Sequence, residues 1–240
     1  MEMSENRMQQ AVLFDFDGTL FDSYPHVLAS LEKVLAEENI SCDHTELWRR
    51  LLVNYGEGRK YAGLTPEAYR RFVDYQYIMD ENEIEPKVIP FEGMRDLLEA
   101  IVKNGGKNYL YTHRNNTGLA FLDRFGMTEF FADFVTSEEH FPAKPAPNAV
   151  LAIMERNHLD PKDCIMVGDR LIDGMSGINA GIAGALITAA TDNTKTPAND
   201  YDAVALETEL VPAVAHVTRE TMTHVVRDLA EFRTEMGIEG

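Results

Sequence analysis

This chain of 240 residues has little cysteine and little positive charge. Its two cysteines, Cys42 and Cys164, are too few for a disulfide framework and form no zinc-type cluster, which favours a reducing compartment. With 22 basic residues against 40 acidic ones, the formal net charge is −18, so the chain lacks the cationic surface that nucleic acids and anionic membranes attract. We therefore expect neither a nucleic-acid partner nor a membrane partner.

Long apolar runs are also missing. The polar stretch 1–10 lacks the apolar centre of a signal peptide, and the longest apolar run, near residues 181–190, is too short to cross a bilayer. The expected location is the cytoplasm. Because 45% of the residues are hydrophobic, the chain is able to bury one large core together with a smaller accessory unit.

Short apolar runs alternate with segments of helical pattern through most of the chain. The runs lie at residues 11–14, 109–111, 134–135, 164–167 and 185–187, and the helical segments at 93–103, 118–125, 148–156 and 171–180. This alternation predicts an α/β fold with a doubly wound, Rossmann-like parallel sheet.

An insertion follows the first predicted strand. Phe14 and Tyr109 are separated by about three times the length of an ordinary crossover between parallel strands. Within this interval Val27, Leu31 and Val34 recur at helical spacing. We predict a core domain of residues 1–23 and 89–240 and an inserted helical cap domain of residues 24–88.

The end of the chain carries a further apolar pattern. Its members are Met222, Val225, Val226, Leu229 and Phe232. Their spacing predicts a C-terminal helix that packs one face on the core.

The motif Asp15-Phe16-Asp17-Gly18-Thr19 directly follows the first predicted strand. In open α/β sheets, ligands bind beyond the carboxyl ends of the strands. Because Phe16 faces the other way, the two carboxylates lie together, and one is able to attack phosphorus while the other moves protons. Two such close carboxylates repel each other unless a cation lies between them, and Mg²⁺ suits hard oxygen ligands and phosphate.

Other polar groups follow the remaining predicted strands and helices. Gly168 and Asp169 follow the run 164–167, and Asp169 completes a candidate metal site. Asp173, one helical turn later, is placed to support that site. Thr112 follows another strand and offers a hydroxyl group. Lys144 precedes the prolines that open a predicted helix, and it supplies the local cation that so acidic a chain needs beside a phosphate.

Taken in this order, these motifs resemble those of the haloacid dehalogenase superfamily, and the insert resembles the helical cap of its phosphoglycolate phosphatase-like branch. The resemblance implies that Asp15 is the nucleophile and Asp17 the general acid and base. It also implies a Mg²⁺ ion held by the Asp15 carboxylate, the Asp17 main-chain carbonyl and Asp169. Thr19 and Asp173 are expected to support these ligands through hydrogen bonds.

The same resemblance implies that Thr112 and Lys144 bind phosphate, and His113 is a candidate to join them. His113 and Arg114 stand where many relatives carry asparagine after the motif threonine, so Arg114 is a candidate for substrate specificity. In the insert, we expect residues 54–60 to form a glycine-bearing loop that closes over the substrate, with Arg59 pairing with an anionic leaving group. The alternatives are an exposed turn at residues 54–60 and a His113 ring in solvent.

The function predicted is a magnesium-dependent phosphatase that hydrolyses a small phosphorylated metabolite, phosphoglycolate or a sugar phosphate, through an aspartyl-phosphate. A phosphosugar mutase of the β-phosphoglucomutase type is the alternative, since it shares the covalent intermediate and the capped fold. A catalytically silent binding protein is a third possibility, although such relatives usually lack a nucleophile or a metal ligand and this chain lacks neither. The protein is expected to be a monomer or a homodimer.

Overall fold

The computed structural model describes residues 10–53, 55–82, 88–187, 211–214, 216–217 and 219–238. Its centre is a six-stranded sheet in the order β5-β4-β1-β6-β7-β8, and every neighbouring pair is parallel. The strands are β1 (Ala11–Phe14), β4 (Lys107–Tyr111), β5 (Phe131–Val135), β6 (Cys164–Gly168), β7 (Ala183–Ile187) and β8 (His224–Val226). The predicted α/β parallel sheet is therefore confirmed.

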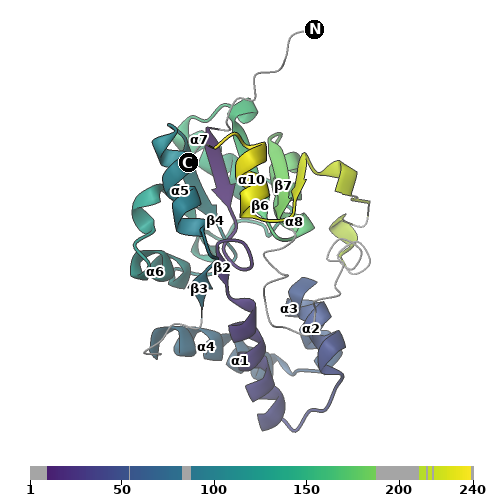
Figure 1. The fold of residues 1–240 in the computed structure, drawn as a ribbon. Coiled ribbons are helices and arrows are strands. Elements are labelled where there is room, and N and C mark those ends of the chain that lie inside the picture. The colour runs from purple at the N-terminus through teal and green to yellow at the C-terminus, as the bar shows by residue number, and fades with distance from the viewer. Residues whose placement is uncertain are drawn as a thin grey trace.

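Helices cover both faces of this sheet (Figure 1). They are α5 (Met94–Lys103), α6 (Thr117–Arg124), α7 (Asn148–Asn157), α8 (Leu171–Asn179) and α10 (Leu229–Glu235). Side chains of β1 alternate between the two layers, because successive residues of a strand point to opposite faces. Val12 and Phe14 pack in the core that holds α5, α6 and α10, whereas Leu13 packs in the core that holds α7.

Short 3₁₀ helices complete the connections within the described chain. They are η1 (Thr128–Phe130), η2 (Ser137–Glu139), η3 (Pro161–Asp163), η4 (Pro212–Val214) and η5 (Arg219–Thr221).

The described part of the long insertion contains four helices, which lie below the sheet in Figure 1. They are α1 (Tyr24–Glu37), α2 (His44–Val53), α3 (Tyr55–Ala62) and α4 (Pro66–Asn82). These helices have an apolar cluster of their own, centred on Trp48, Leu31 and Phe72. A small antiparallel pair, β2 (Phe21–Asp22) with β3 (Ile89–Pro90), joins the two ends of the insertion. The division into the domains 1–23 with 89–240 and 24–88 stays a prediction.

The predicted glycine-bearing loop at residues 54–60 is wrong, because residues 55–60 belong to helix α3. Asn54 itself lies outside the described residues. Gly58 explains the difference: a Cβ atom at this position would lie 3.2 Å from the Leu51 Cα. The glycine thus permits close packing of α3 on α2 and does not mark a flexible turn.

The predicted single helix at the C-terminus is also wrong. Val225 and Val226 lie in strand β8, which pairs in parallel with β7, and α10 begins only at Leu229. Asp228 sets this start, since its carboxylate accepts a hydrogen bond from the Glu231 main-chain N–H at 2.9 Å. A short apolar stretch fits both periods, and here β-branched residues and an open sheet edge favour the strand.

None of the described helices combines the length and the apolar character that a membrane crossing requires.

Candidate active site

Three adjacent strands deliver the predicted residues to one edge of the sheet. Asp15 follows β1, Thr112 follows the neighbouring β4, and Asp169 follows β6 on the other side. The Asp15 main-chain N–H donates to the Val167 carbonyl at 2.9 Å, so the alignment of β1 with β6 extends to the site. Parallel strands end at the same edge of the sheet. This topology brings Asp15 and Asp169 together, although they are 154 positions apart in the sequence.

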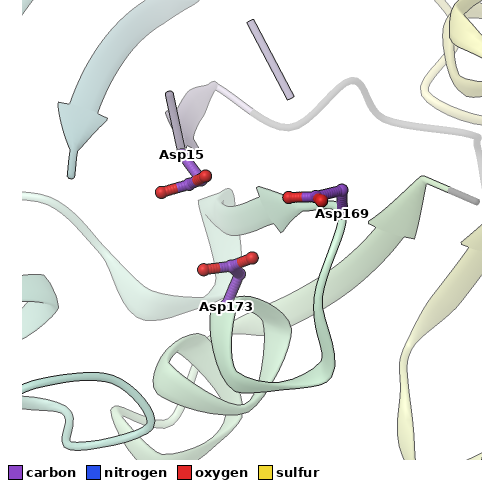
Figure 2. Close-up of side chains that lie close together, drawn as sticks. All are labelled: Asp15, Asp169 and Asp173. Atoms are coloured by element: carbon purple, nitrogen blue, oxygen red, sulfur yellow. The ribbon is translucent and has the colours of Figure 1, made fainter. Parts of the chain in front are cut away.

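Three buried aspartates form the centre of the site. Carboxylate oxygens of Asp15, Asp169 and Asp173 lie within 4.8 Å of one another, and Figure 2 shows these side chains converging from β1, β6 and the start of α8. Lys144 neutralises part of this charge. Its Nζ lies 2.5 Å from Asp15 Oδ1 and 2.9 Å from Asp173 Oδ1, and its side chain is fully buried.

The electrostatics of the cluster favour an additional cation. Burial raises the pKa of Asp15 to about 6, despite the attraction of Lys144. Burial and the negative charge of Asp173 raise the pKa of Asp169 to about 7. Burial opposes ionisation of Asp173 as well, but Lys144 outweighs it and lowers the pKa of that carboxyl. Asp15 and Asp169 are thus the two carboxylates that Lys144 leaves incompletely stabilised.

A hard divalent cation fits these residues. Asp15 Oδ2 is buried and accepts no hydrogen bond from the described residues, which is costly for a carboxylate oxygen. Asp169 lies beside it with a raised pKa. Oxygen ligands of this kind suit Mg²⁺, and a bound cation would favour the ionised form of both groups.

Asp17 is held by an ion pair that the sequence did not indicate. Arg114 Nη2 lies 2.7 Å from Asp17 Oδ1, and the guanidinium lies over the rings of Phe16 and Phe121 at 5.1 and 5.6 Å. Burial alone would raise the pKa of Asp17, but the charge and hydrogen bond of Arg114 outweigh it and lower the pKa. Arg114, predicted as a specificity residue, therefore directly contacts the predicted acid and base.

Gly18 is required by the turn that carries Asp17. Its φ is +78°, and a Cβ atom here would lie 2.4 Å from Asp169 Oδ2. Thr19 follows and donates from its hydroxyl to Asp169 Oδ1 at 3.2 Å. The motif thus contacts Asp169 from the neighbouring strand, and the supporting role of Thr19 stays a prediction.

Thr112 and His113 both lie at the site. The buried Thr112 hydroxyl oxygen accepts a hydrogen bond from the Arg114 main-chain N–H at 3.0 Å. His113 Nε2 accepts one from the Lys144 main-chain N–H at 3.1 Å. Desolvation and the positive charge of Lys144 lower the pKa of His113, so the ring stays neutral and able to accept. His113 therefore helps to position Lys144, in addition to lining the cavity described next.

A cavity of about 360 Å³ lies above these groups. On the core side it is lined by Asp17, His113 and the cations Arg114, Lys144 and Arg170. On the side of the insert it is lined by Tyr24 of α1 and by three residues of α4, namely Tyr69, Val73 and Gln76.

Sequence reasoning missed several residues of this cavity. Arg170 directly follows Asp169 and could have been found from that position. Tyr69, Val73 and Gln76 lie four and three positions apart, so they share one face of α4.

Arg59 is not among the described residues that line the cavity. Its guanidinium lies 5.2 Å from the centre of the Tyr69 ring, and its Nε donates to the Leu64 carbonyl at 3.4 Å. The predicted contact between Arg59 and a leaving group therefore has no direct counterpart in this arrangement.

Replacing Arg59 by alanine is expected to change kcat/KM by less than about twofold, because the side chain reaches the cavity only through Tyr69. Gln76→Leu provides the matched comparison within the insert, since Gln76 lines the cavity and its Nε2 is buried without a hydrogen-bond acceptor among the described residues. We expect this variant to lose more than about fivefold in kcat/KM, the value of one hydrogen bond. Steady-state kinetics on the best substrate measures both. A tenfold loss of kcat/KM in Arg59→Ala would show that Arg59 does act at the site.

The fold and the site together define a hydrolase with an aspartate at the end of the first strand of a parallel sheet. The family model described as haloacid dehalogenase-like hydrolase matches residues 12–187, and the chain belongs to this family.

Individual relatives agree with this membership. The chain is 28% identical over 191 residues to the phosphoglycolate phosphatase of Caulobacter vibrioides, covering 74% of this chain and 78% of that protein. It is 28% identical over 188 residues to the N-acetylmuramic acid 6-phosphate phosphatase of Pseudomonas putida, covering 74% and 82%. A haloacid dehalogenase-superfamily hydrolase from Geobacter sulfurreducens superposes with a TM-score of 0.59 at 25% identity, covering 77% of this chain and 90% of that one. The predicted enzyme class, a phosphatase among these hydrolases, is confirmed.

Proposed function

We propose that this protein is a magnesium-dependent phosphatase that hydrolyses a small phosphorylated metabolite through an aspartyl-phosphate on Asp15. The observation that carries the proposal is that Asp17 and Lys144 line one cavity of about 360 Å³ and that Asp15 lies 2.5 Å from the Lys144 ammonium group. Such a cavity suits a small metabolite. The metal would be held by the Asp15 carboxylate, the Asp17 main-chain carbonyl and Asp169, and it would supply positive charge beside the phosphoryl oxygens.

The first step is a displacement at phosphorus. A carboxylate oxygen of Asp15 forms a bond to phosphorus while the bond to the leaving oxygen breaks, and Asp17 gives its proton to that oxygen. Lys144 and Arg170 face the same space and offset the negative charge of the phosphoryl group. These local cations offset the repulsion that a chain of net charge −18 exerts on anions.

The second step reverses the proton transfer. Asp17, now ionised, removes a proton from a water molecule whose oxygen bonds to phosphorus, and the Asp15–phosphorus link breaks to release inorganic phosphate. The ion pair with Arg114 supports this step, since it favours the ionised form of Asp17. The approach of a phosphate dianion has the opposite effect and favours the protonated form needed first.

The helices of the insertion act in this proposal as a cap over the substrate. Tyr69, Val73 and Gln76 present a mixed apolar and polar surface to the group that leaves with the alkoxide oxygen. Phosphoglycolate is the leading candidate substrate, on the resemblance and on the relative from Caulobacter. The similar identity to an N-acetylmuramic acid 6-phosphate phosphatase makes sugar phosphates the next group to test. The proposed location is the cytoplasm, with Cys42 and Cys164 as free thiols.

A screen of phosphorylated metabolites with the purified full chain tests this function. We expect release of phosphate from at least one small phosphomonoester in the presence of Mg²⁺, a fall of more than about tenfold after chelation, and recovery when Mg²⁺ is added back. A bisphosphorylated sugar is included in the panel. Conversion of a sugar monophosphate into its isomer without free phosphate would establish the mutase instead. Activity that chelation leaves unchanged would contradict the metal dependence.

A further inference from the structure

Tyr24 joins the helical insertion to the acidic cluster. It is the first residue of α1, its side chain is buried, and its hydroxyl donates to Asp169 Oδ2 at 2.6 Å. The same hydroxyl lies 3.4 Å from the Asp17 main-chain carbonyl oxygen. Gly18 leaves room for this approach, since a Cβ atom there would lie 2.5 Å from Tyr24 Cε2.

Both acceptors of this hydroxyl belong to the set that the proposed function assigns to the metal. A hydroxyl that donates to Asp169 Oδ2 directs its proton at a lone pair of that oxygen, and a cation coordinated by this lone pair would exclude the proton. Tyr24 and a divalent cation therefore compete for Asp169.

Asp169 does not depend on Tyr24 for its placement. Its other oxygen, Oδ1, accepts the Thr19 hydroxyl at 3.2 Å, and its backbone continues directly from β6. Loss of the Tyr24 bond therefore leaves the carboxylate held from the core side.

The ring of Tyr24 packs against the apolar cluster of the insertion. It meets Trp48 of α2 edge-on, with 6.1 Å between centroids and 85° between planes. Trp48 is fully buried in the apolar cluster of the insertion and is the single tryptophan of the chain. A displacement of the Tyr24 hydroxyl from Asp169 must alter this contact, because ring and hydroxyl are one rigid unit.

We propose that Tyr24 couples the metal site to the helical insertion: its hydroxyl bonds Asp169 Oδ2 until a divalent cation takes that oxygen, and the displaced ring alters the contact with Trp48. The inference rests on the divalent site of the proposed function. If so, Tyr24 weakens Mg²⁺ binding, and Mg²⁺ binding changes the packing of Tyr24 against the helices of the insertion.

Tyr24→Phe tests the proposal, since it removes the hydroxyl and keeps the ring. Titration of chelator-treated full-length protein with MgCl₂ by calorimetry is expected to give a dissociation constant about 10- to 150-fold lower in the variant, the worth of a hydrogen bond to a charged group. In the wild type, Trp48 fluorescence is expected to change with the same midpoint as the calorimetric titration. In Tyr24→Phe most of that change should disappear.

Tyr75→Phe is the matched control. It also removes a tyrosine hydroxyl of the insertion that bonds a carboxylate, here Glu37 at 2.8 Å, but on the exposed side of α4. Its Mg²⁺ affinity and fluorescence response should equal those of the wild type.

Three results would overturn the proposal, and they distinguish failure of the coupling from failure of the proposed function. Equal or weaker Mg²⁺ binding by Tyr24→Phe, or a wild-type Trp48 signal that ignores bound Mg²⁺, would refute the coupling and leave the proposed function intact. Absence of Mg²⁺ binding by wild type and both variants would refute the metal site of the proposed function and the coupling with it.

Discussion

Asp15→Asn is expected to lower kcat by at least about 10⁴-fold, the largest effect of any single substitution in this chain. An amide is a poor nucleophile, so the covalent step that divides the hydrolysis into two displacements is lost. Lys144 keeps Asp173 as a partner at 2.9 Å, and the buried carboxylate that is removed is one whose pKa burial had raised to about 6. The variant should therefore fold, and its defect should be chemical.

Two measurements check this expectation. Phosphate release is followed on the best substrate, and the wild-type protein is quenched with acid during turnover and digested, to locate a phosphorylated peptide that contains Asp15. Asp96→Asn, on the exposed first turn of α5, is the matched control and should behave as wild type. Phosphate release by Asp15→Asn at the wild-type rate would assign the activity to a contaminant or to another nucleophile.

The core of the site was predictable because topology decides it. Once β1, β4 and β6 are parallel neighbours, Asp15, Thr112 and Asp169 must lie at one edge, whatever the details of packing. The prediction needed only apolar runs that end in polar residues. Lys144 belongs to the same group, since the strands and α7 bring its segment to that edge.

The contacts that Arg114 and Tyr24 make with the aspartates of the site were not predictable from the local sequence pattern. Arg114 reaches Asp17 only because Phe16 and Phe121 form a surface for its guanidinium, and that surface exists only in the folded core. Tyr24 lies in the segment predicted as the helical cap, yet its hydroxyl donates to Asp169 of the core. Spacing indicates which face of a helix is buried but not what that face meets.

The two errors of secondary structure have a similar origin. Gly58 lies in a helix because α3 packs closely on α2, a tertiary requirement that overrides the low helix propensity of glycine. Val225 and Val226 form a strand because β7 offers an unpaired edge. Both elements depend on tertiary contacts, and the spacing of apolar residues within one segment does not show which contacts form.

Asp17→Asn is expected to lower kcat on an alkyl phosphate by about 10²- to 10⁴-fold, the usual worth of a positioned acid and base. The alkoxide that leaves needs a proton, and asparagine has none to give. Nitrophenyl phosphate is a sharper probe, because nitrophenolate leaves without protonation. The first step should then stay fast while the second, which needs Asp17 as the base, becomes slow.

The variant should therefore release a burst of nitrophenolate close to one equivalent of enzyme, followed by slow turnover, and the phosphorylated Asp15 peptide should accumulate. Rapid-mixing absorbance measures the burst, with wild type and Asp96→Asn as the comparisons that turn over steadily. Alkyl phosphate turnover near the wild-type rate would show that Asp17 is not the acid. A slow nitrophenyl phosphate reaction without a burst would show that Asp17 acts in substrate binding or in holding Arg114. Loss of the 2.7 Å ion pair would then leave the Arg114 guanidinium without its carboxylate partner.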